Sequence, residues 1–222
     1  MLTKGESDMS ILRSLVLAVC FGLPAVQADT LITAREGTGQ AGGSQTPGAE
    51  QGQSRQIWLR ADRMASLDSD GRMIGRLDRG ETYVLRDANK SCFRVKHKKQ
   101  DIDTSAQRES VFQKTGETKQ VGPWETVGYE ATIPLNESAT YKLSIWVSDE
   151  VTLGLEDYQT YTKGTVTPAT YWLVDSLSLG GYPVLQETQI GAMTSWMQIT
   201  SVKAAKPPAG IYEIPAGYTG CD

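Results

Sequence analysis

Hydrophobic and polar positions alternate most clearly between Trp124 and Val147. Two runs are separated by residues 134–138, and in each run every second residue is apolar: Val127, Tyr129, Ala131 and Ile133, then Tyr141, Leu143, Ile145 and Val147. A period of two is typical of a β-strand with one buried face, and a short break rich in Pro, Asn and Ser is typical of a turn. The pattern therefore predicts an antiparallel hairpin in the middle of the chain.

Shorter alternating runs on both sides of this hairpin predict further strands, as in an all-β meander. They cover residues 31–35, 57–60, 62–67, 73–77, 81–86 and 91–96 before the hairpin, and residues 184–190 and 195–202 after it. Residues 37–53 are rich in Gly and Gln without apolar periodicity, which predicts a mobile loop. Residues 97–119 are polar and are compatible with a long loop or with a short helix over 105–114. Residues 207–218 predict an extended tail.

Two segments after the hairpin have helical spacing instead. Residues 155–162 carry apolar side chains three and four positions apart, and Gly164 ends the segment. A second helix is predicted over residues 168–179, because Thr167 and Pro168 suit a helix start and Gly180 suits a helix end. A meander, a helical insert and a returning hairpin together predict an α+β fold.

The N-terminus has the pattern of a signal peptide over residues 1–28. Arg13 precedes an apolar core at residues 14–23, and the small residues Val26 and Ala28 suit cleavage before Asp29. The apolar core is too short to span a bilayer, and no later run is long enough. Lipidation at Cys20 is the alternative, but Val19 beside it fits a lipoprotein signal poorly, so simple secretion is favoured.

Cleavage after Ala28 leaves Cys92 and Cys221 in the mature chain. An exported compartment permits a disulfide between them. Two single cysteines so far apart in the sequence are equally compatible with free thiols, so both states remain open.

The inventory of reactive residues argues against an enzyme. His97 is the only histidine, which excludes a two-histidine metal site and leaves a poor candidate for a catalytic triad. The segment Asp68–Gly71 lacks the later ligands of a calcium loop and is interpreted as a turn. No glycine-rich phosphate loop is present, and no cofactor or metal is expected. With 22 basic and 26 acidic residues, the chain gives no reason to expect nucleic acid as a partner.

Aromatic and apolar residues gather in the predicted helical insert. Two interpretations apply to this cluster: the side chains complete the core against the sheet, or they line a lipid-sized cavity between helix and sheet. Apolar stripes at helical spacing are usually core, so the filled core is favoured on pattern alone. The candidate cavity-lining residues are Tyr158, Tyr171, Trp172, Leu173 and Leu177.

Several short motifs together resemble an uncharacterised family of exported bacterial proteins near the periplasmic lipoprotein carriers of the LolA/LolB kind. The motifs run from Ile57 to Tyr218 and are Trp58 with Arg63–Ala65, Arg76–Arg79, Gly122–Trp124, Tyr182–Gln186 and Pro208–Tyr218. The resemblance implies a strongly curved antiparallel sheet, an incomplete barrel, with helices over its concave face. In the carriers that concavity holds acyl chains. The family has no assigned catalytic residues.

These observations lead to one expected function and one alternative. We expect an exported, non-catalytic envelope protein, periplasmic or secreted, with a single LolA-like domain over residues 29–222 that binds an apolar ligand or an envelope partner. The alternative is a structural or protein-interaction module whose core is filled.

Overall fold

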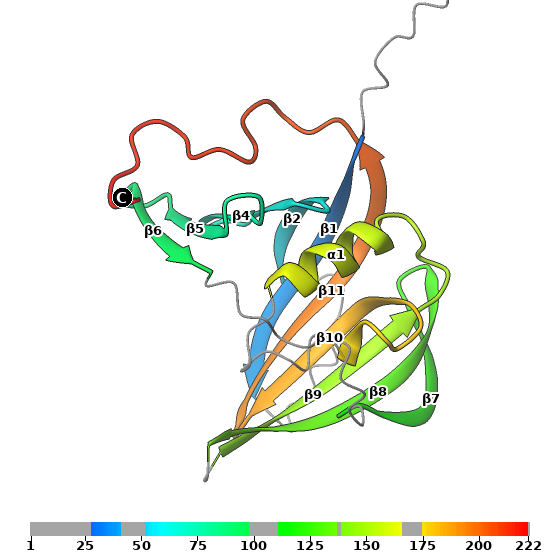
Figure 1. Cartoon of the computed structure of the whole chain (residues 1–222). Helices are drawn as coiled ribbons and strands as arrows, with labels where there is room; N and C mark the ends of the chain where they lie inside the picture. Colours follow the sequence, from blue (N-terminus) through cyan, green and yellow to red (C-terminus); the bar gives the residue numbers. More distant parts are fainter. Residues whose placement is uncertain (1–27, 41–51, 98–110, 137–138, 166–174, 222) are drawn as a thin grey trace, which may run out of the picture.

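The computed structural model describes residues 28–40, 52–97, 111–136, 139–165 and 175–221. Within this part of the chain, one antiparallel sheet contains 11 strands in the order β6-β5-β4-β3-β2-β1-β11-β10-β9-β8-β7 (Figure 1). The strands are β1 (Asp29–Gln40), β2 (Gln53–Arg60), β3 (Arg63–Leu67), β4 (Gly71–Arg76), β5 (Glu81–Arg86), β6 (Ser91–Lys96), β7 (Gln113–Val121), β8 (Trp124–Asn136), β9 (Ala139–Ser148), β10 (Tyr182–Ile190) and β11 (Met193–Ala205).

The predicted α+β class, with helices over the concave face, is wrong. The described chain is mostly β, and its one helix of more than a single turn is α1 (Leu155–Thr165). The predicted second helix over residues 168–179 lies mostly outside the described residues; of its end, only residues 175–176 are helical and a turn follows. The sheet itself supplies most of the core, because 11 strands that curl around a common interior bury one face of nearly every strand.

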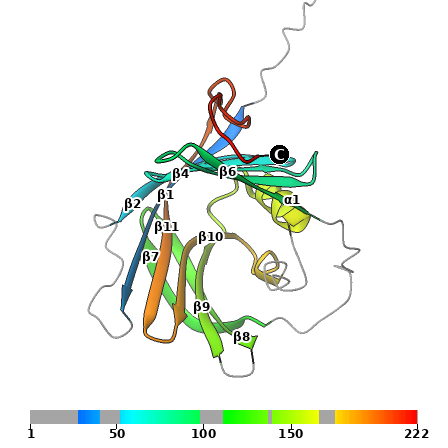
Figure 2. The ribbon, with the colours of Figure 1, turned by 90° about the vertical axis from the view of Figure 1, so that its left-hand side faces the viewer.

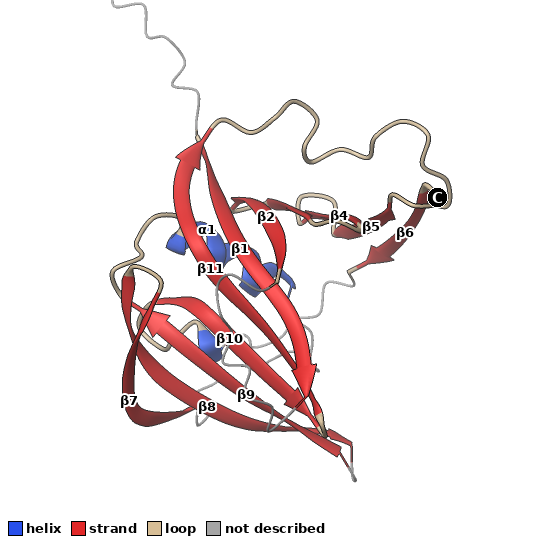
Figure 3. Ribbon diagram, turned by 180° about the vertical axis from the view of Figure 1, so that it is seen from behind, coloured by secondary structure: helices blue, strands red, loops and turns tan. Residues whose placement is uncertain are grey.

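The sheet is curved but not closed, and β6 and β7 form its two edges (Figures 2 and 3). We call the side on which helix α1 and Leu179 pack the inner face, and the opposite side the outer face. In Figure 2, α1 lies on one side of strands β2–β6, and the C-terminal tail, residues 206–221, lies on the other. This half of the sheet is therefore covered on both faces.

The central hairpin is confirmed with its predicted parity. Strands β8 and β9 pair so that Val127 faces Val147, Tyr129 faces Ile145 and Ala131 faces Leu143. Residues directly opposite in an antiparallel pair share a face, so the apolar side chains of both strands form one surface.

Two predicted loops contain strand residues. Residues 37–40 of the predicted mobile loop continue β1, where Gly37 pairs with Trp196; residues 41–51 lie outside the described part. Strand β7 occupies the end of the polar segment that predicted a loop or a helix, and most of its side chains are exposed. An edge strand with few buried side chains has no apolar alternation, so the pattern did not reveal it.

The C-terminal tail covers the outer face of β2–β5. Its residues Ile211 and Tyr212 are buried against Leu31, Trp58 and Ala65. Farther along, Ile214 and Tyr218 pack near a second outer cluster of Ile74, Tyr83, Leu85 and Cys92. Polar contacts anchor the same segment: Arg76 bonds Glu213 at 2.7 Å, and the Tyr212 hydroxyl donates to Asp29 at 2.6 Å.

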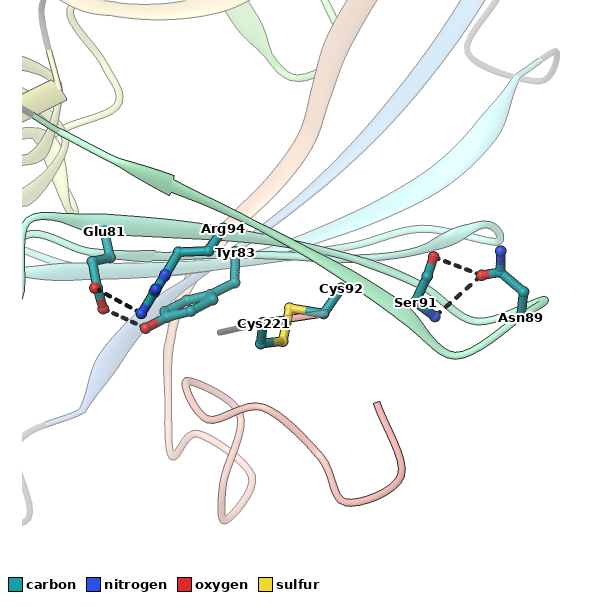
Figure 4. The surroundings of a disulfide bond; sticks show 7 residues. All are labelled: Glu81, Tyr83, Asn89, Ser91, Cys92, Arg94 and Cys221. Carbon is teal, nitrogen blue, oxygen red and sulfur yellow. Dashed lines mark hydrogen bonds and ion pairs between the residues drawn. A yellow bond between two sulfur atoms is a disulfide. The ribbon is translucent and has the colours of Figure 1, made fainter. Parts of the chain in front are cut away.

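A disulfide joins Cys92 of β6 to Cys221 at the end of this tail, with the two Cα atoms 5.0 Å apart (Figure 4). Beside it, the Cys92 amide donates to the Thr219 carbonyl at 2.7 Å, and the Thr219 amide donates to the Lys90 carbonyl at 3.0 Å. The tail thus adds a short parallel bridge to the outer edge of β6. The covalent bond and the backbone bonds hold the tail at the same point.

Candidate functional site

The inner face of the β8–β9 hairpin carries an apolar cluster that faces the interior of the curved sheet. Alternation places one apolar set on this face, and the curvature of the sheet turns it inward. Phe112 and Leu179 pack onto it. The buried members are Phe112, Ala131, Leu143, Ile145 and Val147, and the half-buried members are Tyr129, Ile133, Tyr141 and Leu179.

The segment 175–179 lies inside the curve of the sheet, as the short helical turn before β10 in Figure 2 shows. The Tyr129 hydroxyl donates to the Leu179 carbonyl at 3.2 Å, which ties the segment to β8. An Asp175 carboxylate oxygen accepts a bond from the Val111 amide at 3.3 Å, which ties it to the residues before β7. These bonds position Leu179 over the apolar surface.

A cavity of about 510 Å³ opens beside this surface, where β7, β8 and β9 meet the segment 179–180. Its apolar wall consists of Val127, Tyr129, Val147 and Leu179. The rest of its wall is polar and is formed by Thr118, Lys119, Gln120, Glu125, Thr126, Asp149 and Gly180. The cavity volume is within the range of small-molecule sites.

Lys119 is the cation among the described residues that line this cavity. Its ammonium nitrogen lies 3.8 Å from the centroid of the Trp146 ring, on the opposite face of the hairpin. Burial lowers the pKa of Lys119, and Glu187 and Glu117 oppose that shift. The ammonium is thus held by a cation–π contact on the outer face of the hairpin, away from the apolar part of the cavity wall.

The residues predicted to line a cavity fall into two groups. Tyr158 and Leu177 are described, whereas Tyr171, Trp172 and Leu173 lie outside the described residues. Tyr158 packs its ring against Tyr182, with the ring centroids 4.9 Å apart. Burial raises the pKa of the Tyr158 hydroxyl, and hydrogen bonds with Thr162 and Ser176 oppose the shift. Leu177 is half-buried.

Helix α1 packs closely on the inner face at the other end of the sheet. Tyr161 is buried, and burial raises its pKa to about 12, opposed by a hydrogen bond with Thr82. Thr82 Oγ1 also lies 2.7 Å from Nε2 of His97. The single histidine is therefore part of a contact between α1, β5 and the end of β6.

Three titratable side chains, Lys119, Glu125 and Asp149, belong to the polar part of the cavity wall. Among the residues that the structure describes, no three His, Cys, Asp or Glu side chains lie close enough together to hold a metal ion. In the same part of the chain, no helix is long and apolar enough to cross a membrane.

Fold and site define a class of protein with an open, curved antiparallel sheet and an apolar inner surface. The chain belongs to the family described as "Domain of unknown function (DUF4412)", whose model matches residues 59–218. A comparison with curated proteins gives no match.

Among solved structures, the chain is similar to the crystal structure of the lipoprotein LppX from Mycobacterium tuberculosis. The sequence identity is 11%, the alignment covers 80% of this chain and 87% of that one, and the TM-score is 0.31.

The hairpin side of the cavity could be found from sequence, but the rest of its wall could not. Val127, Tyr129 and Val147 belong to the alternating set that predicted a buried face. Thr118–Gln120, Asp149 and Gly180 carry no signal of their own, because they reach the cavity through the curvature of the sheet and the position of the segment 175–180.

Proposed function

We propose that this protein is an exported, non-catalytic envelope protein that binds an apolar ligand against the inner face of the β8–β9 hairpin. The observation that carries the proposal is the cavity of about 510 Å³, in which Val127, Tyr129, Val147 and Leu179 form an apolar wall beside the apolar cluster of the hairpin and polar residues form the rest. Small-molecule sites usually combine apolar walls with polar groups that orient the ligand.

Export is supported by two independent features. The disulfide between Cys92 and Cys221 is of a kind that persists in oxidising compartments. Strand β1 begins at Asp29, the first residue after the proposed cleavage site. On this basis residues 1–28 are a signal peptide and residues 29–222 form the mature domain, which resides in the periplasm or is secreted.

Replacing Val127 with aspartate tests the ligand site. Val127 is half-buried in the apolar part of the cavity wall, so a carboxylate at this position places a charge beside Tyr129, Val147 and Leu179. We expect the Val127→Asp variant to bind the neutral fluorophore N-phenyl-1-naphthylamine at least about 10-fold more weakly than the wild-type protein, because the charge must be desolvated when the probe enters. Fluorescence titration of the two proteins measures the difference.

Phe93→Asp is the matched control, because Phe93 is 66% exposed on the edge strand β6 and lies outside the cavity. It is expected to leave probe affinity unchanged. Val127→Thr, which keeps the shape of the side chain, should weaken binding about 3-fold if Val127→Asp does not fold. Equal probe binding by wild type and folded Val127→Asp contradicts the proposed site.

One observation favours the alternative, a structural or interaction module with a filled core. Leu143 and Ile145 are only 0% and 2% exposed, so the chain itself already covers the middle of the hairpin surface. A wild-type protein that takes up no apolar probe would establish this alternative.

A further inference from the structure

The inner face changes from apolar to polar between two neighbouring strands. In the register, Ile145 of β9 faces Gln186 of β10, and Leu143 of β9 faces Thr188. Residues opposite one another share a face, so these four side chains belong to the same surface. Two apolar side chains therefore lie beside two polar ones across a single strand spacing of about 4.8 Å.

The polar character continues across the next strands. Gln186 faces Met197 of β11, Met197 faces Glu36 of β1, and Glu36 faces Gln53 of β2. In the neighbouring row, Thr188 faces Ser195, and Ser195 faces Thr38. Apart from Met197, every inner-face side chain in these two rows beyond β9 can form hydrogen bonds.

A second cavity, of about 720 Å³, lies over these two rows. This cavity is lined by all seven residues of the two rows. They are Gln186, Met197, Glu36 and Gln53 in the first row and Thr188, Ser195 and Thr38 in the second, and Gly37, Gly52 and Trp196 complete the wall. The first cavity is close by, because Val147 in its wall lies two residues along β9 from Ile145, about 7 Å. Ile145 itself is 2% exposed, so a lipid-sized molecule that reaches both cavities passes over the residues that cover Ile145.

The charges around the polar cavity do not suit an anionic group. Glu36 is the one ionisable side chain in its lining. Arg55 Nη2 lies 2.7 Å from Glu36 and 2.9 Å from Asp68, so this guanidinium is shared by two carboxylates. The remaining partners on the polar rows are amides and hydroxyls, which donate and accept hydrogen bonds without charge.

We propose that the polar cavity binds the neutral, hydroxyl- or amide-bearing head group of an amphiphile whose apolar part lies against the β8–β9 hairpin. This inference rests on the proposed function and defines its ligand class. An apolar chain alone would leave the polar rows without partners, and an anionic head group would meet a site with one more carboxylate than cations. A neutral polar head group satisfies both conditions.

The test compares two amphiphiles of equal chain length, decyl maltoside and decanoate, as competitors of N-phenyl-1-naphthylamine below their micelle-forming concentrations. The wild-type protein is expected to bind decyl maltoside about 10-fold more tightly than decanoate. The double variant Gln186→Leu/Thr188→Val removes hydrogen-bonding groups next to the apolar boundary. It should reduce this preference to below about 3-fold, because each lost hydrogen bond weakens binding by a few-fold.

Thr33→Val is the matched control, since Thr33 is half-buried on β1 with the opposite parity to Glu36 and thus on the outer face. It should keep the wild-type preference. Direct binding of N-phenyl-1-naphthylamine should be the same in all three proteins.

The possible failures are distinguishable. If the wild-type protein binds the fluorophore but both amphiphiles displace it equally, or if the double variant keeps the full preference, the head-group inference is wrong and the proposed function stands. If the wild-type protein does not bind the fluorophore at all, the proposed function and this inference both fail.

Discussion

Removal of the Cys92–Cys221 disulfide is expected to lower the free energy of unfolding by about 3–5 kcal/mol. The two cysteines are 129 residues apart, so the bond closes a long loop in the unfolded chain. In the chain-entropy model, closing a loop of this length stabilises the folded protein by about 5 kcal/mol. Residual structure in the reduced, unfolded chain makes the stabilisation smaller. Urea unfolding of the Cys92→Ala/Cys221→Ala variant and of the wild-type protein measures the difference.

Reducing agent supplies the control for this prediction. It should shift the unfolding midpoint of the wild-type protein toward that of the double variant and leave the double variant unchanged. The tail beyond Ile214 should also become susceptible to proteolysis first, because Arg76–Glu213 and Tyr212–Asp29 still hold the preceding residues. Identical unfolding of the oxidised and reduced wild-type protein would contradict the role of the bond.

The substitution Gly75→Ala is expected to destabilise the protein by about 3 kcal/mol, although alanine in a strand is normally the better residue. A Cβ atom added at Gly75 would lie 1.7 Å from the Tyr161 hydroxyl oxygen, so α1 has to move away from β4. Tyr161 is buried and hydrogen-bonded to Thr82, which leaves its side chain little freedom to shift. Thermal and urea unfolding measure the effect.

A double-mutant cycle separates this contact from a general effect on β4. Tyr161→Phe alone should cost about 1 kcal/mol, because it removes the hydrogen bond to Thr82. In the combined variant the hydroxyl is gone, and the nearest ring carbon lies 2.8 Å from the added Cβ, so part of the loss should be recovered. If the two substitutions change the free energy of unfolding additively, the Tyr161 hydroxyl does not limit the space at Gly75, and the explanation is wrong.

The sequence predicted the structure best where apolar residues recur at a single spacing, either every second residue or every three to four residues. The alternation in Trp124–Val147 predicted the β8–β9 hairpin and its inward-facing set, because one face is buried and the other is not. The spacing of Leu155, Tyr158 and Tyr161 predicted α1 for the same reason, since these residues all pack against the core.

The pattern of apolar and polar residues gave a wrong prediction, or none, where side chains make tertiary contacts with residues far away in the sequence. The α+β prediction gave too much weight to the apolar residues before Leu179, while the structure builds its core mainly from the curved sheet. The packing of Ile211 and Tyr212 on the outer face was not visible either, because an extended tail has no periodicity. The polar cavity arises from the register of the four strands β1, β2, β10 and β11, which no local pattern contains.

The central claim is that the inner face of the sheet binds an apolar ligand. The most direct test is to identify the molecules that are bound to the protein when it is purified. The protein is purified without detergent from the envelope of its own host, extracted with organic solvent, and the extract is analysed by mass spectrometry. The account predicts about one apolar molecule per protein chain, absent from the Val127→Asp variant prepared in the same way. An extract free of apolar molecules, from wild-type protein that also fails to bind N-phenyl-1-naphthylamine, would contradict it.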